Sequence, residues 1–226
     1  LFIALARCFG SLSLPSFSQE DEEQVDTRIH WFSLSGKLDS LGLWTDKGFQ
    51  KLWIPSGYLP DAERYTGPNP LTVVQMEKRG EEEGEVPVPA AIVRIPPDAK
   101  QVLVMVRKTD NPEEGEPPYQ SFAVDVSMER LPEESYWVWN LTGRPVRGKV
   151  GSLPLRVDAG QRTVLRPGLE GGPRAVDAKL LFGDDPSGGS YTSTKWFLNP
   201  DQRLLMMLLR DGPEGEDKIR VKALKL

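Results

Sequence analysis

The chain has 226 residues, 38% of them hydrophobic and 27% charged, and carries a net charge of −5 at pH 7. This length is sufficient for one large domain or two small ones, and 21 Gly with 20 Pro leave little room for long helices. The acidic balance argues against a nucleic-acid partner, and no run approaches the roughly 20 apolar residues of a transmembrane span.

Residues 1–18 have the character of the end of a secretory signal peptide. Leu1–Ala6 is entirely apolar, Ser16-Phe17-Ser18 places small residues around a cleavage site, and the acidic Gln19–Glu23 follows. Arg7 counts against this interpretation, and a buried N-terminal strand or helix is the alternative. The segment predicts export to the periplasm, the outer cell surface or the medium. Cleavage would also remove Cys8, leaving no cysteine for a disulfide.

Short apolar or alternating runs separated by turn residues follow along the rest of the chain. They are 29–34, 51–54, 71–76, 90–95, 102–106, 122–126, 136–141, 153–157, 163–165, 175–182, 192–197, 203–209 and 219–224. Runs this short and this evenly spaced predict an all-β protein with very little helix. We expect two immunoglobulin-like β-sandwich modules, residues 25–110 and 119–226, with one intertwined unit as the alternative. The polar segment 108–118 between them is either a linker or a long hairpin loop.

A turn at Asn199-Pro200 lies between two apolar runs near the end of the chain. Residues 201–210 could form a helix by composition, but Trp196–Arg203 has the pattern of a strand, a turn and a returning strand. We therefore expect a β-hairpin here.

The segment Ser135–Val146 predicts a central core strand that ends in a turn. Trp137 and Trp139 share one face of the strand and Tyr136 and Val138 the other, so both faces are apolar. We expect the Asn140 amide to bond the backbone at the strand end and Gly143 to supply the turn conformation. Asn140-Leu-Thr also matches a glycosylation acceptor, which we interpret as accidental.

The same segment resembles part of a group of exported proteins. Ser135–Val146, with the strands Leu155–Gly160 and Arg162–Gly168, is similar to the second half of uncharacterised exported β-sandwich proteins of Verrucomicrobia-type environmental bacteria. Further similarity lies in Trp31–Gly36, Tyr65–Leu71 and Thr194–Pro200. The resemblance implies a β-sandwich fold and export, and it carries over no functional residues.

Side chains that could support catalysis or bind a metal are few. His30 is the only histidine and has no Ser or Cys near it in sequence, so we expect a surface or edge residue. The loop 184–190 contains Asp184 and Asp185 but lacks the alternating ligands of a calcium loop, and an ordinary turn is favoured. The acidic clusters 81–85, 113–116 and 214–217 are interpreted as solvated loop tips. The sequence predicts no enzyme activity, no metal site and no cofactor.

Two kinds of side chain suggest binding. Of six tryptophans, Trp31, Trp137, Trp139 and Trp196 lie within apolar runs and should be buried. Trp44 and Trp53 flank the turn 45–48 and could be exposed platforms for stacking sugars.

The second binding candidate is a basic segment, residues 140–180, which carries a net charge of +5 within an acidic chain. The arginines selected from it are Arg144, Arg147, Arg162 and Arg166. A solvated sheet face would explain these charges, and so would a surface for an envelope protein or an acidic polysaccharide. The sequence thus predicts an exported, non-catalytic protein with a binding or structural role at the cell envelope, with a carbohydrate-binding module as the alternative.

Overall fold

Four four-stranded β-sheets make up the described part of the chain, and no helix occurs there. The computed structural model describes residues 23–78, 84–168, 172–183, 191–211 and 218–226. The all-β fold and the sandwich architecture predicted from the short strands are confirmed.

The first half of the chain forms two sheets. The outer N-terminal sheet has the order β3-β2-β5-β6, with β3 Gly48–Lys51, β2 Leu41–Thr45, β5 Leu71–Lys78 and β6 Glu85–Val93. The inner N-terminal sheet has the order β4-β1-β7-β8, with β4 Glu63–Asn69, β1 Glu23–Ser33, β7 Gln101–Lys108 and β8 Tyr119–Asp125.

The second half forms two more sheets. The inner C-terminal sheet has the order β12-β9-β15-β16, with β12 Arg162–Leu165, β9 Tyr136–Asn140, β15 Leu204–Asp211 and β16 Lys218–Lys225. The outer C-terminal sheet has the order β11-β10-β13-β14, with β11 Leu153–Val157, β10 Val146–Val150, β13 Arg174–Phe182 and β14 Thr192–Leu198.

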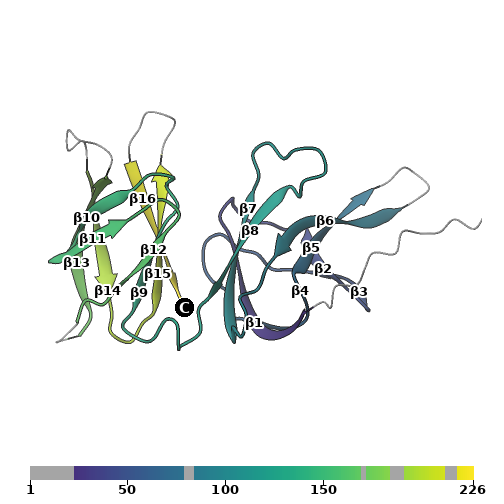
Figure 1. The fold of residues 1–226 in the computed structure, drawn as a ribbon, viewed down its shortest axis with the longest axis horizontal. Coiled ribbons are helices and arrows are strands. Elements are labelled where there is room, and N and C mark those ends of the chain that lie inside the picture. The colour runs from purple at the N-terminus through teal and green to yellow at the C-terminus, as the bar shows by residue number, and fades with distance from the viewer. Residues whose placement is uncertain (1–22, 79–83, 169–171, 184–190, 212–217) are drawn as a thin grey trace, which may run out of the picture.

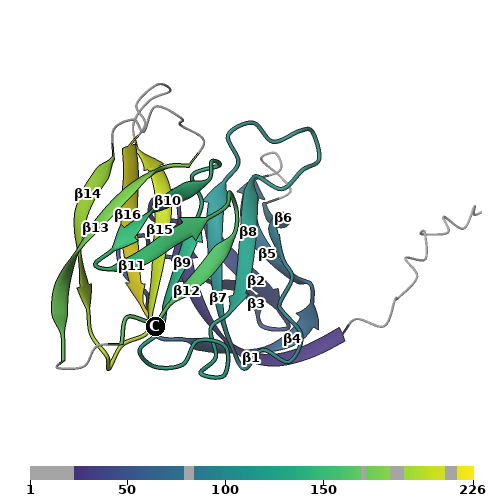
Figure 2. The same ribbon diagram turned by 60° about the vertical axis from the view of Figure 1, so that its left-hand side comes forward.

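The four sheets are stacked as layers, with the two inner sheets facing each other (Figures 1 and 2). Three apolar cores lie between successive layers. Because neighbouring strand residues point to opposite faces, Trp31 enters the first core and Phe32 the second. The second core joins Phe32 and Met105 of one half to Trp139 and Met207 of the other. The two sandwiches therefore share a buried interface.

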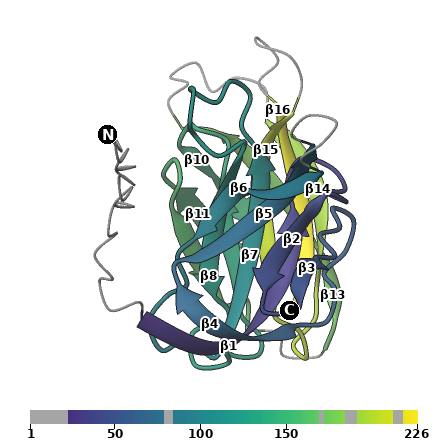
Figure 3. The same ribbon diagram turned by 90° about the vertical axis from the view of Figure 1, so that its right-hand side faces the viewer.

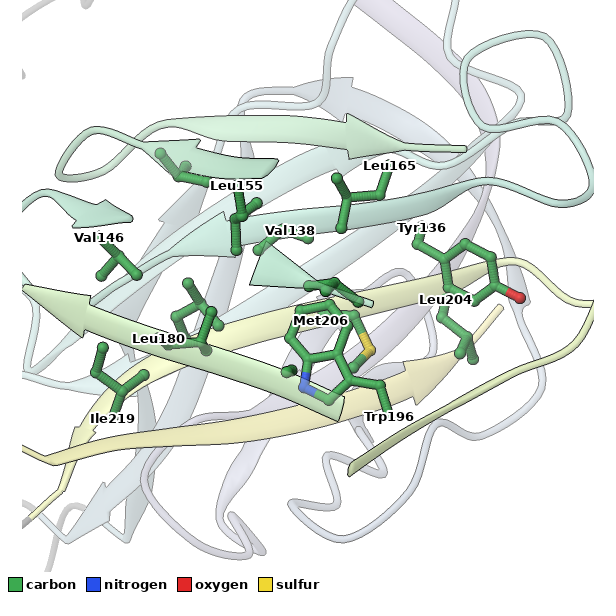
Figure 4. Close-up of a cluster of buried hydrophobic side chains, with 14 of the residues drawn as sticks. Tyr136, Val138, Val146, Leu155, Leu165, Leu180, Trp196, Leu204, Met206 and Ile219 are labelled. Carbon is green, nitrogen blue, oxygen red and sulfur yellow. The ribbon is translucent and has the colours of Figure 1, made fainter. Parts of the chain in front are cut away.

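The third core fills the C-terminal sandwich. Tyr136, Leu180 and Trp196 meet there from both of its sheets (Figure 4). The Tyr136 hydroxyl donates to the Asn199 carbonyl at 2.6 Å and accepts from the Asn199 N–H at 2.6 Å. This pair of bonds anchors the chain where it passes from β14 to β15.

The two sandwiches are copies of one topology. Each strand of the second half takes the place of the strand eight earlier, and in both halves the first strand runs parallel to the seventh. The hydrogen bonds that follow the first strand of each half also repeat. The Leu34 N–H donates to the Val106 carbonyl and the Leu141 N–H donates to the Leu208 carbonyl, both at 2.8 Å. Gly36 and Gly143 follow with φ of +89° and +81°. The chain thus contains two copies of one eight-strand unit, a repeat that the local sequence patterns do not predict.

The end of β9 is held by one buried amide. The Asn140 amide nitrogen donates to the carbonyls of Arg144 (2.7 Å) and Val157 (2.9 Å), and its Oδ1 accepts from the N–H and the hydroxyl of Thr142. Asn140 is fully buried, so the predicted capping role is confirmed. In the folded protein the amide is also inaccessible as a glycosylation acceptor.

The boundary between the halves differs from the predicted one. Strand β8 pairs antiparallel with β7, so segment 108–118 is the hairpin loop and not a linker. Residues 119–125 therefore belong to the N-terminal sandwich, and the chain crosses to the second half over 126–135. Arg203 holds this crossover by donating to the carbonyls of Val126 (2.8 Å) and Leu131 (3.3 Å).

The prediction of a β-hairpin around Asn199-Pro200 is wrong. The turn exists, but β14 pairs with β13 in the outer sheet while β15 pairs with β9 and β16 in the inner sheet. The segment is a crossover between two layers. Strand β15 is buried along most of its length, which suits an internal strand better than one arm of an edge hairpin.

Candidate functional site

The outward face of the outer C-terminal sheet is strongly basic. In β10, Val146 and Val150 point into the core, so Arg147 and Lys149 point outward. Register places Arg156 of β11 beside Arg147, and Lys179 of β13 beside Lys149. Lys195 of β14 extends the same face. We call these five exposed side chains the basic face.

Two exposed aromatic rings lie on the strand that bounds the basic face. Phe197 of β14 is 62% exposed, and Tyr191, which directly precedes β14, is 58% exposed. The two residues have the same strand parity as Lys195, whereas Trp196 and Leu198 point inward. The Lys179 Nζ lies 5.6 Å from the centre of the Tyr191 ring. Cations and stacking surfaces are thus combined on one open sheet face.

The four arginines selected from the sequence do not form one surface. Arg147 belongs to the basic face, whereas the Arg144 guanidinium stacks over Phe182 at 4.3 Å beyond the end of β9. Arg162 and Arg166 lie on and just after β12 in the inner C-terminal sheet. The sequence prediction did not select Lys195, although its alternation with the apolar Trp196 was a usable signal.

The prediction that two tryptophans are exposed is confirmed. Trp44 is 54% exposed and Trp53 is 44% exposed, while the other four are buried. Trp44 lines a groove of about 600 Å³ together with Thr72, Pro68 and Pro89. The Trp53 indole N–H donates to the Tyr58 hydroxyl at 2.9 Å, and the Lys37 Nζ lies 4.8 Å from the Trp53 ring centre. Trp53 is therefore already engaged within the chain, whereas Trp44 offers an open ring (Figure 3 shows β2, which carries it).

His30 is not the surface residue that the sequence predicts. It is 8% exposed and lies on β1, an internal strand between β4 and β7. Its Nδ1 lies 2.8 Å from the Pro60 carbonyl and its Nε2 lies 2.5 Å from the Gln101 amide nitrogen. A neutral imidazole satisfies both, donating from Nδ1 and accepting at Nε2. Burial lowers the pKa of His30 below its ordinary value of 6.5.

This lowered pKa predicts a dependence of stability on pH. Above about pH 6.5 the imidazole is neutral in both states, but below that value the unfolded chain takes up a proton that the folded protein refuses. The free energy of unfolding should therefore fall as the pH drops from 7.5 to 5.5, measured by urea denaturation. His30 is the only histidine, so the slope should flatten in His30→Gln. An unchanged slope in that variant would contradict the assignment.

Several sequence predictions fall outside the described residues. These are the signal segment 1–18, the Asp184-Asp185 loop, residues 81–83 of the acidic cluster 81–85, and the whole of the acidic cluster 214–217. Within the described ranges, no three His, Cys, Asp or Glu side chains are grouped to share a metal ion. The described part of the chain also contains no helix that could span a bilayer.

The chain matches no protein-family model, and no curated protein matches it significantly. The surfaces themselves therefore provide the evidence on function.

Proposed function

We propose that this chain is an exported, non-catalytic binding protein that holds an acidic polysaccharide on the basic face. The observation that carries the proposal is the pairing of like charges across neighbouring strands. Arg147 is the direct partner of Arg156, and Lys149 is the direct partner of Lys179. Like charges directly opposite each other destabilise a sheet. Arg156 has a carboxylate partner within the chain, because its Nε lies 4.0 Å from the Asp158 Oδ1. The lysine pair therefore carries the proposal that an anionic ligand compensates for the repulsion.

The spacing of the basic face suits a polymer. Side chains two residues apart on one strand lie about 7 Å apart, and neighbouring strands lie about 5 Å apart. The four cations of β10, β11 and β13 thus form a compact cluster, and Lys195 lies one strand further on. Two carboxylates accompany these cations: Asp177 lies opposite Lys195, and the Asp158 Oδ1 lies 4.0 Å from the Arg156 Nε.

The exposed rings favour a glycan among polyanions. Tyr191 and Phe197 bound the face at positions about 20 Å apart along the strand direction. A sugar ring can stack on such a side chain while a neighbouring uronate carboxylate meets a cation. An acidic protein segment would use the cations but gain less from rings at this separation.

The binding role and the export are supported by different features. An open sheet face holds an extended ligand by many weak contacts, whereas catalysis uses convergent groups in a pocket. The apolar run Leu1–Ala6 and the small residues at Ser16-Phe17-Ser18 support export, which would place the protein where acidic envelope polysaccharides occur.

The test uses neutralisation of the central lysine pair. Lys149→Gln with Lys179→Gln should weaken binding of polygalacturonate about tenfold or more, measured by isothermal titration calorimetry at low salt. Because the change removes a repulsive pair, the free energy of unfolding should stay equal or rise, which separates lost binding from lost folding.

The matched control has the same change of charge elsewhere. Lys51→Gln with Lys225→Gln alters two exposed lysines outside the basic face and should keep wild-type affinity. If both double variants lost the same polygalacturonate affinity, the effect would come from the net charge of the protein and not from the basic face. Tighter binding of poly-aspartate or DNA than of polygalacturonate would reject the glycan assignment.

The groove at Trp44 supports a second candidate, a platform for a neutral sugar. An open indole bordered by prolines is a common stacking surface for glycans. In the same titrations, this candidate requires that an uncharged glucan binds and that Trp44→Ala, but not the lysine double variant, abolishes the binding.

A further inference from the structure

A cleft lies at one edge of the interface between the two inner sheets, lined by the edge strands β8 of the first half and β12 of the second, which are near each other in Figure 2. Its volume is about 880 Å³, within the range of small-molecule sites, which often lie at domain junctions. It is separate from the basic face, because β12 and β8 belong to the inner sheets. Its use is therefore independent of the polysaccharide proposal.

The wall on the second half combines the apolar Trp137 and Val164 with Thr163 and one cation, Arg162. The Trp137 ring is almost fully buried, and Val164 of β12 is 42% exposed. The Arg162 guanidinium lies over the Trp137 ring, with its Cζ 4.7 Å from the ring centre. Stacking fixes the orientation of the guanidinium while its N–H donors stay available in its plane.

The wall on the first half contributes charges of both signs. Asp98, on the loop before β7, and Asp125, at the end of β8, both line the cleft with Arg130 of the crossover segment. The Arg130 Nε lies 3.7 Å from the Asp125 Oδ2, which is longer than a hydrogen bond. Arg130 is also 74% exposed, so its donors can turn to a ligand.

We infer that the cleft binds a small zwitterion with a flat apolar body, of the class of a free aromatic amino acid. The ligand carboxylate would meet the guanidinium groups of Arg162 and Arg130. Its ammonium group would meet the exposed Asp98, since the Asp125 Oδ1 already accepts from the Ser127 N–H at 2.9 Å. Its ring would lie against Val164. Two cations and two carboxylates in one cleft suit a ligand that carries both charges better than a simple anion or cation.

Three probes of one shape test this inference. L-Phenylalanine carries both charges, 3-phenylpropionate lacks the ammonium group, and phenethylamine lacks the carboxylate. Isothermal titration calorimetry on the full chain should show binding of L-phenylalanine and at least about tenfold weaker binding of the other two, because each lacks one charged contact. If 3-phenylpropionate bound as tightly as L-phenylalanine, the cleft would not select a zwitterion. If L-phenylalanine did not bind at all, the whole proposal would be overturned.

Two substitutions of arginines with the same strand parity, one inside the cleft and one outside it, test where L-phenylalanine binds. Arg162→Gln should weaken L-phenylalanine binding about tenfold or more while leaving polygalacturonate binding unchanged. Arg166→Gln is the matched control, since Arg166 has the same parity but does not line the cleft. Equal effects of the two substitutions, or none of Arg162→Gln, would overturn the placement. Failure of the polysaccharide titration would leave this result unaffected.

Discussion

Replacing Asn140 with aspartate should destabilise the protein by about 3–5 kcal/mol, although only one nitrogen is exchanged for oxygen. The Asn140 amide nitrogen donates to two carbonyl oxygens, those of Arg144 and Val157, at 2.7 and 2.9 Å. A carboxylate oxygen at this place would face both carbonyls without a proton between them. The site is fully buried, so water cannot relieve the repulsion. Urea denaturation followed by circular dichroism at pH 7 would measure the loss.

Two further measurements isolate the cause of this loss. Asn199 makes the matched control, because its Oδ1 accepts from the Asp201 N–H at 2.9 Å and an aspartate keeps that bond. Asn199→Asp should therefore change stability by less than about 0.5 kcal/mol. Burial should raise the pKa of the new carboxyl at 140, so the deficit relative to wild type should shrink as the pH falls from 7 to 4. A deficit that is constant over this range would show that charge is not responsible.

The features that the sequence predicts correctly depend on residues that lie close together along the chain. The segment 135–146 was interpreted correctly because strand parity, the capping amide and the turn glycine lie within twelve residues. The buried and exposed tryptophans were assigned correctly for the same reason. By contrast, the short apolar runs do not include β10 (Val146–Val150), because its alternation of Val, Arg, Gly and Lys leaves only two apolar residues in five.

Features that depend on distant pairing could not be obtained from local patterns. The sequence between β14 and β15 resembles a hairpin turn, yet the flanking strands belong to different sheets because β15 pairs with β9, more than sixty residues earlier. The repeat was hidden similarly, since equivalent positions such as Ser33 and Asn140 share a role but not a residue type. The basic face also required register between β10 and β13 to bring Lys149 beside Lys179.

The shared core between the halves leads to the second large effect. Leu103 of β7 and Leu205 of β15 occupy equivalent positions in the two copies, both are fully buried, and both lie in the second core. Leu103→Ala or Leu205→Ala should each destabilise the protein by about 2–5 kcal/mol through the lost apolar contact and the cavity. Because this core is built from both sandwiches, either substitution should weaken both halves.

Hydrogen exchange followed by mass spectrometry distinguishes shared from separate stability. In either variant, exchange should accelerate in β5 and in β13, which lie in the two outer sheets on opposite sides of the substituted core. Leu180→Ala provides the control, since Leu180 is fully buried in the third core and contacts only the C-terminal sandwich. It should accelerate exchange in β13 more than in β5. If Leu205→Ala also affected β13 alone, the two sandwiches would be independent folding units joined by a contact that adds little stability. If β5 responds as well, the interface is part of the cooperative core, and the cleft beside it is held in a fixed shape by both halves.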